Sequence, residues 1–293
     1  MSTLAGKTLF ITGASRGIGL AIALRAARDG ANIAIVAKSA EPDPRLPGTV
    51  YTAAQAIESA GGRALPIVCD IRFEDQVIDA VRQTVKTYGG IDAVINNASA
   101  ISLTPTEATT MKRFDLMHQI NTRGTFLVTR CCLPHLREAA NPHVVMISPP
   151  LDLRPSWFAP HLAYSIAKFG MGLCVLGMAE EFRAAGIAIN ALWPRTAIGT
   201  TAVRNVLGGE RIVAMSRKPD IVADAVYLLL TQPARALTGQ FLIDDTFLWQ
   251  TGGITDFDGY RIDPTQPLVQ DFFVPNAIPA PPGVTVLPLP LSG

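Results

Sequence analysis

The chain alternates short runs of apolar, often β-branched residues with longer segments in which apolar positions recur at helical spacing. Most of the short runs are apolar throughout, as expected for strands that are covered on both faces. The predicted strands are 7–12, 32–37, 64–70, 92–97, 143–148, 187–193 and 240–244, and the predicted helices include 19–30, 74–89, 112–136, 162–186 and 221–232. This alternation predicts a Rossmann-like α/β fold, a doubly wound parallel sheet of seven strands with helices on both faces.

Two proline-rich stretches interrupt the alternation, and the second one follows the predicted domain. Residues 39–49 form a loop after the second predicted strand, and the other stretch is 255–293. The prolines of residues 255–293 fit neither a helix interior nor a central strand. We therefore predict one dinucleotide-binding domain over residues 1–254. The extension 255–293 is predicted to be an extended arm, packed on the surface or against a neighbouring subunit, with a disordered end as the alternative.

The composition fits such a domain and excludes several classes of partner. Apolar residues make up 48% of the 293 residues, and the net charge is +1. The chain can bury a large core, and it lacks the basic field that nucleic-acid binding requires. No apolar run of about 18 residues and no secretory signal stand out, so no membrane span is expected. The four cysteines have no metal-ligand spacing and are expected to be reduced, which predicts no metal site and a cytoplasmic location.

A glycine-rich turn follows the first predicted strand. In TGASRGIG, Gly13, Gly17 and Gly19 stand at the entrance to the first helix. Glycines let the backbone approach a pyrophosphate closely, and a helix N-terminus supplies free N–H donors and the positive end of a dipole. The turn therefore predicts a dinucleotide site, which includes Gly13, Ser15, Arg16, Gly17, Ile18 and Gly19.

The residue after the second strand bears on which dinucleotide binds. An acid about 20 residues beyond the glycines binds the ribose 2′-hydroxyl of NAD, but Lys38 stands there and Arg16 lies in the turn itself. Two cations suit a 2′-phosphate, so NADP(H) is predicted. The alternatives are that both are solvated surface charges, or that Glu41 binds the ribose. Asp70, at the end of the third strand, is predicted to accept from the adenine amino group or to cap the following turn.

The segment HLAYSIAKFGM carries the candidate catalytic pair. Tyr164 and Lys168 are four residues apart and share one face of a helix. A nearby ammonium is expected to lower the pKa of the phenol, which then exchanges a proton with a carbonyl or an alcohol. Lys168 can also donate to ribose hydroxyls.

With this pair in place, the chain resembles the short-chain dehydrogenase/reductase family over roughly residues 7–245. The resemblance is carried by TGASRGIG, by the Cys69–Asp70 pair, by NNAS and IN, and by YSIAK. It implies Tyr164 as general acid/base, Lys168 as its partner and Asn121 as the holder of a water in a proton relay. It also implies that Asn97 and Ala98 line the cofactor, that Thr196 and Ile198 lie near its carboxamide, and that the protein is a homotetramer or homodimer.

Longer strings such as ISPPLDLRPSWF narrow the resemblance to the hydroxysteroid dehydrogenase-like subfamily. Its longer members carry a sterol-carrier-like domain, and this chain is expected to lack one, so lipid carriage is not transferred.

The chain departs from the family pattern where the catalytic serine is expected. Thirteen residues before the tyrosine the chain has Leu151, and the alternative is Ser148 at the end of the fifth strand. Ser148 is therefore a candidate for orienting the substrate carbonyl, and a strand-end serine that satisfies backbone groups is the other reading. The usual Pro-Gly after the sixth strand is Pro194-Arg195.

The loops around the expected cleft suggest the substrate. The cleft is expected to have apolar walls made by Leu151, Leu153, Trp157, Phe158 and Met215. Such walls predict a small or medium-sized apolar alcohol or carbonyl substrate. Arg154 and Arg195 instead suggest an acid or a CoA phosphate. The predicted function is NADP(H)-dependent interconversion of an apolar alcohol and its ketone or aldehyde. An enoyl-thioester reductase and a non-catalytic NADP-binding protein are the alternatives.

Overall fold

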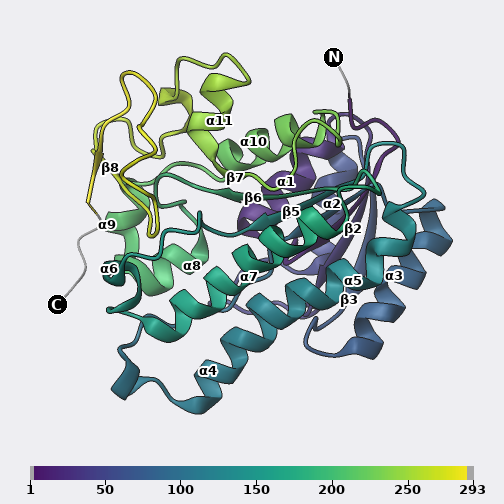
Figure 1. The fold of residues 1–293 in the computed structure, drawn as a ribbon, viewed down its shortest axis with the longest axis horizontal. Helices are drawn as coiled ribbons and strands as arrows, with labels where there is room; N and C mark the ends of the chain where they lie inside the picture. The colour runs from purple at the N-terminus through teal and green to yellow at the C-terminus, as the bar shows by residue number, and fades with distance from the viewer. Residues whose placement is uncertain (1–2, 289–293) are drawn as a thin grey trace.

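A seven-stranded parallel sheet forms the centre of the molecule (Figure 1), a computed structural model that describes residues 3–288. The strands are β1 (Thr8–Thr12), β2 (Asn32–Ala37), β3 (Arg63–Val68), β4 (Ala93–Asn96), β5 (His143–Ile147), β6 (Ala188–Trp193) and β7 (Phe241–Ile243). Their order is β3-β2-β1-β4-β5-β6-β7, and every neighbouring pair is parallel. The predicted Rossmann-like fold is confirmed. The order reverses between β1 and β4, and such a switch point opens a ligand crevice at the carboxyl ends of the strands.

Two helical layers cover the sheet, which explains why its central strands are apolar throughout. One layer contains α1 (Gly17–Ala27), α2 (Val50–Ser59), α10 (Asp220–Leu230) and α11 (Asp244–Gln250), and the other contains α3 (Glu74–Tyr88), α5 (Thr125–Leu136) and α7 (Leu162–Glu181). Leu9 and Ile11 of β1 belong to the core on the first side, and Phe10 between them belongs to the core on the other. All three are completely buried, as the two-sided cover requires.

The helix predicted over 112–136 is present but is not a regular α-helix. It consists of α4 (Met111–Met117), a π-helical turn over His118–Gly124, and α5. Asn121 lies within the π-helical turn and is fully buried. Single π-helical turns inside long helices are frequent at functional sites.

Short helices and the C-terminal extension lie near the carboxyl end of the sheet. The short helices are α6 (Pro155–Phe158), α8 (Thr201–Val203) and α9 (Gly209–Ala214). The extension, drawn in yellow in Figure 1, contains the two-stranded pair β8 (Leu268–Val269) and β9 (Val286–Leu287). Phe272, Phe273 and Val274 of the extension are buried in the core. Residues 268–274 therefore pack against the body of their own chain.

The long helix α7 is apolar enough to cross a membrane by length and composition, but 61% of its apolar window is buried inside the structure. It packs on β5 and β6 of the sheet, beside α5.

Candidate functional site

A cavity of about 580 Å³ follows the carboxyl ends of the strands from β2 and β3 to β6. Its walls come from the glycine turn, from the residues after β2, β3 and β4, and from the start of α7. Predicted site residues that line it are Gly13, Ser15, Arg16, Gly17, Ile18, Lys38, Asp70, Asn97, Ala98, Tyr164, Lys168 and Ile198. The switch point of the sheet and the predicted chemistry therefore coincide.

The glycine turn is packed so closely that side chains do not fit. A Cβ on Gly13, whose φ is +67°, would lie 2.9 Å from Ala98 Cα. A Cβ on Gly19 would lie 2.5 Å from Asn97 Nδ2. That amide donates to the carbonyl oxygens of Thr12 (3.0 Å) and Gly13 (3.2 Å), which ties the segment after β4 to the turn. Gly19 thus serves the packing of α1 against the segment after β4, while Gly13, Ser15, Arg16, Gly17 and Ile18 line the cavity.

The residues predicted to bind the adenosine end are near each other, and two of them already have partners. Arg16 donates to the carbonyl oxygens of Pro47 (3.0 Å) and Gly48 (2.5 Å) in the proline-rich loop. Asp70 accepts from Arg72, both from its backbone N–H and from its guanidinium. Burial by itself raises the pKa of Asp70, but the hydrogen bonds and charge of Arg72 lower it on balance. Lys38 is exposed at the rim of the cavity.

The candidate catalytic pair occupies the first turns of α7. Tyr164 is nearly buried and lines the cavity. Lys168 donates to the carbonyl oxygen of Ile147 at 2.7 Å, and its ammonium lies 5.0 Å from the centre of the Trp193 ring. The lysine is thereby held at the end of β5, one helical turn below the phenol.

The pKa of the phenol is shifted opposite to the expectation from sequence. Burial raises the pKa of Tyr164, and the negative charge of Asp271 raises it further. Burial lowers the pKa of Lys168 to about 7, a shift that Asp271 partly opposes. The lysine is therefore only partly charged at neutral pH and points to a carbonyl oxygen, so it does not lower the phenol pKa here.

Asn121 is fixed by the loop after β4. Its Oδ1 accepts from the Ala100 N–H at 2.8 Å, and its Nδ2 donates to the Ala100 carbonyl oxygen at 3.0 Å. The side chain thus connects the π-helical turn to the cavity wall, since Ala100 lines the cavity.

Like Gly19 and Asn121, the predicted site residues Ser148 and Thr196 do not line the cavity. Ser148 and Thr196 are completely buried. Their hydroxyl groups have no hydrogen-bond partner among residues 3–288. Leu151, at the serine position of the family pattern, packs toward α7, where it would contact a Cβ on Gly172.

The residues expected to form apolar walls do not line the cavity, and neither do the two arginines expected to bind an anion. The cavity is lined by other apolar residues: Ala100, Ile101, Leu116, Ile120, Ile147, Trp193, Val203, Leu207 and Phe272. Trp157 instead packs on Phe273, and Leu153 is exposed. Arg195 is buried in an ion pair with Asp245, and Arg154 pairs with Asp152, so both charges are already partnered within the chain.

Among the cavity-lining residues that sequence reasoning missed, Asp271 and Phe272 come from the C-terminal extension. The only signal was the string DFF, an acid followed by two aromatic residues within a stretch otherwise rich in prolines.

The walls of this cavity fit a nicotinamide dinucleotide. The glycine turn leaves room for a pyrophosphate at the start of α1, because Gly13 and Gly17 have no side chain there and Ser15 lines the space. The residues after β2 and β3 line one part of the cavity, and Tyr164 and Lys168 line another. The parallel sheet, its glycine turn and the Tyr–Lys pair together define the Rossmann-type dehydrogenase class.

Comparison with known proteins gives the same result. The family model for short chain dehydrogenase matches residues 7–209, and the chain belongs to this family. It is 58% identical over 271 residues to hydroxysteroid dehydrogenase-like protein 2 of Danio rerio, covering 92% of this chain and 64% of the relative. The chain thus spans less than two thirds of that relative's length.

Solved structures share the fold. A protein from Xanthomonas campestris is 57% identical, with a TM-score of 0.91 over 94% of this chain and 100% of its own. A metagenomic short-chain oxidoreductase in complex with NADP is 26% identical, with a TM-score of 0.68 over 83% of this chain and 98% of its own.

Proposed function

We propose that the protein is an NADP(H)-dependent oxidoreductase that interconverts an apolar alcohol and its ketone or aldehyde. The observation that carries this proposal is that the glycine turn, Tyr164 and Lys168 line one continuous cavity. The remaining walls are mostly apolar, which suits a substrate with little charge.

Several residues of the chain would take part in carbonyl reduction, each with a different function. When bound, the cofactor supplies the hydride. Tyr164, whose raised pKa keeps it neutral, donates its phenolic proton to the carbonyl oxygen. Lys168 holds the end of β5, and Asn121 holds the loop after β4. Lys168 would also donate to a ribose hydroxyl of the bound cofactor. A neutral phenol supports reduction in particular, because oxidation of an alcohol needs the phenolate as base.

NADP is proposed over NAD because of Lys38 and Arg16. Both line the cavity where β2 ends, and Lys38 is exposed there. Asp70 is bound to Arg72, so its charge is largely neutralised and does not repel a 2′-phosphate. The metagenomic relative described above is a complex with NADP.

One observation favours the second candidate, an enoyl-thioester reductase. Ser148 does not line the cavity, and polarisation of a carbonyl by a serine matters less when the hydride goes to a carbon–carbon double bond. A non-catalytic NADP-binding protein is the third candidate, which turnover assays exclude or support directly.

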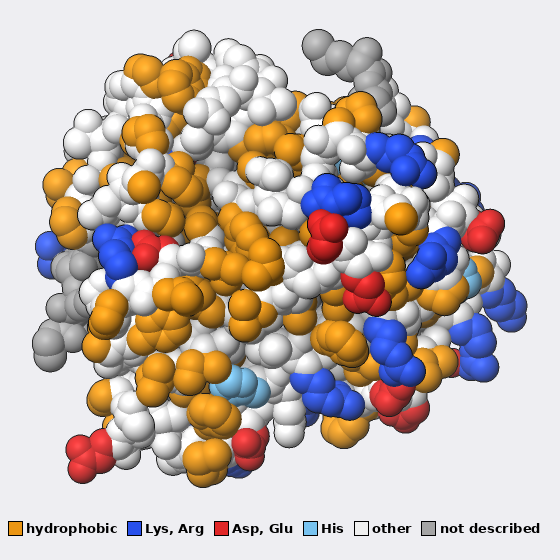
Figure 2. All heavy atoms as spheres, in the orientation of Figure 1, with side chains coloured by type: hydrophobic (Ala, Val, Ile, Leu, Met, Phe, Trp, Pro, Cys, Tyr) orange, Lys and Arg blue, Asp and Glu red, His pale blue; other side chains and the backbone are white. Residues whose placement is uncertain are grey.

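Self-association through α5 and α7 is proposed as well. Phe126 on α5 and Ile166, Leu173 and Leu176 on α7 are exposed apolar side chains. Figure 2 shows apolar side chains on the face that carries α4 and α7. A homotetramer or homodimer in the cytoplasm remains our expectation, and light scattering on the purified chain tests the assembly.

The experiment is an NADPH-oxidation screen over apolar ketones, aldehydes and enoyl-CoA thioesters. We expect turnover of ketones, and we expect Tyr164→Phe to lower kcat by about 10²- to 10⁴-fold while NADPH still binds. Preference for enoyl-CoA would select the second candidate. NADPH binding without oxidation of any carbonyl would overturn the proposed activity.

A further inference from the structure

The C-terminal extension places a carboxyl group in the wall of the cavity. The Asp271 N–H donates to the carbonyl oxygen of Arg195 at 2.8 Å, directly after β6. The next residue is fixed as well, since Trp193 Nε1 donates to the carbonyl oxygen of Phe272 at 2.7 Å. Both contacts join the extension to the end of β6. The position of Asp271 is therefore determined by the frame of the sheet rather than by a free loop.

A strained residue follows. Phe273 has φ +63°, and it is the one non-glycine residue with positive φ among residues 3–288. A bulky side chain adopts this conformation only when its surroundings enforce it. Its ring is completely buried and lies within 6.1 Å, centre to centre, of the rings of Trp157, His161, Tyr164, Phe169, Phe272 and Trp193. Packing around the catalytic tyrosine thus maintains the bend that turns Asp271 to the cavity.

One oxygen of the Asp271 carboxyl group is free to bind a ligand. Oδ1 accepts from the Phe272 N–H at 2.7 Å, whereas Oδ2 has no partner among the described residues. Asp271 lines the same cavity as Tyr164 and Lys168. Lys168 does not neutralise it by direct contact, because the ammonium donates to the Ile147 carbonyl oxygen.

Burial, more than the charged groups around it, favours the neutral form of this carboxyl. Lys168 and Tyr164 face it from α7, Asp244 from the start of α11, and the Arg195 guanidinium behind β6 is bound to Asp245. Burial raises the pKa of Asp271 to about 7, and Asp244 adds to the shift, while the Phe272 N–H and Lys168 oppose it. A protonated carboxyl in an apolar site is a hydrogen-bond donor.

We propose that Asp271, in its protonated form, hydrogen-bonds the reacting oxygen of the substrate beside Tyr164. It thereby supplies the second donor to that oxygen, which Ser148 behind the cavity wall does not. This inference rests on the proposed carbonyl reduction. Asp271 keeps its proton throughout, so the reaction consumes only the hydride from the cofactor and the phenolic proton of Tyr164.

Two readouts test the role, with 1-decalone as the apolar ketone probe. The first is calorimetric binding of 1-decalone to the complex of the full chain with NADP⁺, in which no reaction occurs. We expect binding to weaken about 10-fold between pH 6 and pH 8, as a group with a pKa near 7 loses its proton. Asp271→Asn keeps a donor that does not titrate, so its affinity should change less than about 2-fold. Asp263→Asn, an acid elsewhere in the extension, is the matched control and should behave like the wild type.

The second readout is turnover of 1-decalone with NADPH at pH 6. Asp271→Ala should lower kcat by about 10²-fold, the usual effect of removing one donor to a developing oxyanion. Asp271→Asn should recover most of that loss, which a purely structural role for the carboxyl would not predict.

The outcomes separate this inference from the proposed function. Wild-type binding that is equal at pH 6 and pH 8, or an Asp271→Asn variant with the wild-type pH dependence, would overturn the role of Asp271. Turnover absent across all carbonyls would overturn the proposed function, while the binding measurement would still decide for or against Asp271. Failure of 1-decalone to bind at either pH counts against both.

Discussion

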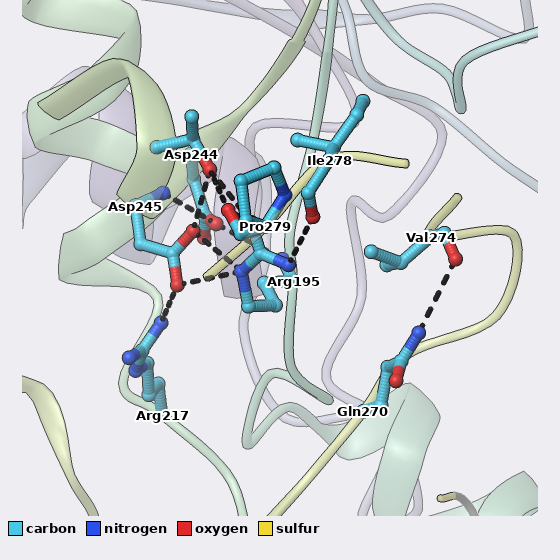
Figure 3. Close-up of polar contacts among 9 residues, drawn as sticks. Arg195, Arg217, Asp244, Asp245, Gln270, Val274, Ile278 and Pro279 are labelled. Atoms are coloured by element: carbon cyan, nitrogen blue, oxygen red, sulfur yellow. Dashed lines mark hydrogen bonds and ion pairs between the residues drawn. The ribbon is translucent and has the colours of Figure 1, made fainter. Parts of the chain in front are cut away.

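The guanidinium of Arg195 lies 2.8 Å from the carboxylate of Asp245, and both side chains are buried. The same carboxylate pairs with the buried Arg217 at 2.9 Å. Arg195 also donates to the carbonyl oxygens of Ile278 (3.1 Å) and Pro279 (3.0 Å), as Figure 3 shows. The residue that stands where the family pattern has glycine therefore fastens the C-terminal extension to the start of α11.

We predict that Asp245→Asn lowers the free energy of unfolding by about 3 kcal/mol or more, because it leaves two buried guanidinium groups without their anion. Urea denaturation measures the change. The control is Glu180→Gln, which removes an exposed pair with Arg183 and should have little effect. Equal midpoints for the two variants would contradict the prediction.

The positive φ of Phe273 predicts an unusual order of substitutions. Phe273→Ala loses the aromatic packing and keeps the strained backbone, so it should destabilise the protein by about 3–5 kcal/mol. Phe273→Gly loses the same packing but tolerates φ +63° without strain, so it should be more stable than the alanine variant by about 1 kcal/mol. Thermal unfolding of both variants checks this order, which is the reverse of that in a regular helix or strand. A less stable glycine variant would show that strain at this position is negligible.

Lys38 is predicted to discriminate between the two nicotinamide cofactors. In Lys38→Asp, a carboxylate replaces the cation at the end of β2, so we expect NADPH to bind about 10-fold more weakly or worse and NADH to bind more tightly. Fluorescence titration with each cofactor measures both affinities. Lys86→Asp makes the same charge change near the end of α3 and should leave the ratio of affinities unchanged. An unaltered ratio in Lys38→Asp would assign the choice of cofactor to other residues.

His143, at the start of β5, is predicted to make the fold sensitive to acid. Its side chain is buried, and burial lowers its pKa to about 4, although a hydrogen bond to the Gln232 carbonyl oxygen partly opposes the shift. In the unfolded chain a histidine has a pKa of about 6.5. The unfolded state therefore binds more protons below pH 6.5, so stability should fall by about 3 kcal/mol between about pH 6.5 and pH 4.

His143→Gln keeps a donor for that carbonyl and does not titrate. Its denaturation midpoint should depend less on pH over this range than that of the wild type. If the denaturation midpoints of His143→Gln and the wild type changed equally with pH, groups other than His143 would cause the acid sensitivity.

The sequence predicted the sheet well because its strands obey a simple physical rule. Ile33 and Ile35 point to one helical layer and Ala34 and Val36 to the other, so a strand covered on both faces must be apolar at every position. The glycine turn and the Tyr–Lys pair were equally readable, because each depends on residues close together in the chain.

Features that depend on distant segments were not predictable in this way. The position of Asp271 depends on Arg195 and Trp193, nearly eighty residues earlier. The direction of the Tyr164 pKa shift depends on the same distant carboxyl. No local pattern contains that information.

In the proposed enzyme, the C-terminal extension separates contact with the substrate from binding of the cofactor. The cofactor half of the cavity is made by the first strands and their loops, whereas residues 271–272 add the last piece of wall to the other half. In the proposed oxidoreductase, substitutions at a few positions of one peripheral peptide can therefore alter the preferred alcohol or ketone without disturbing the scaffold around the glycine turn. The same peptide is the natural target for engineering a new substrate range.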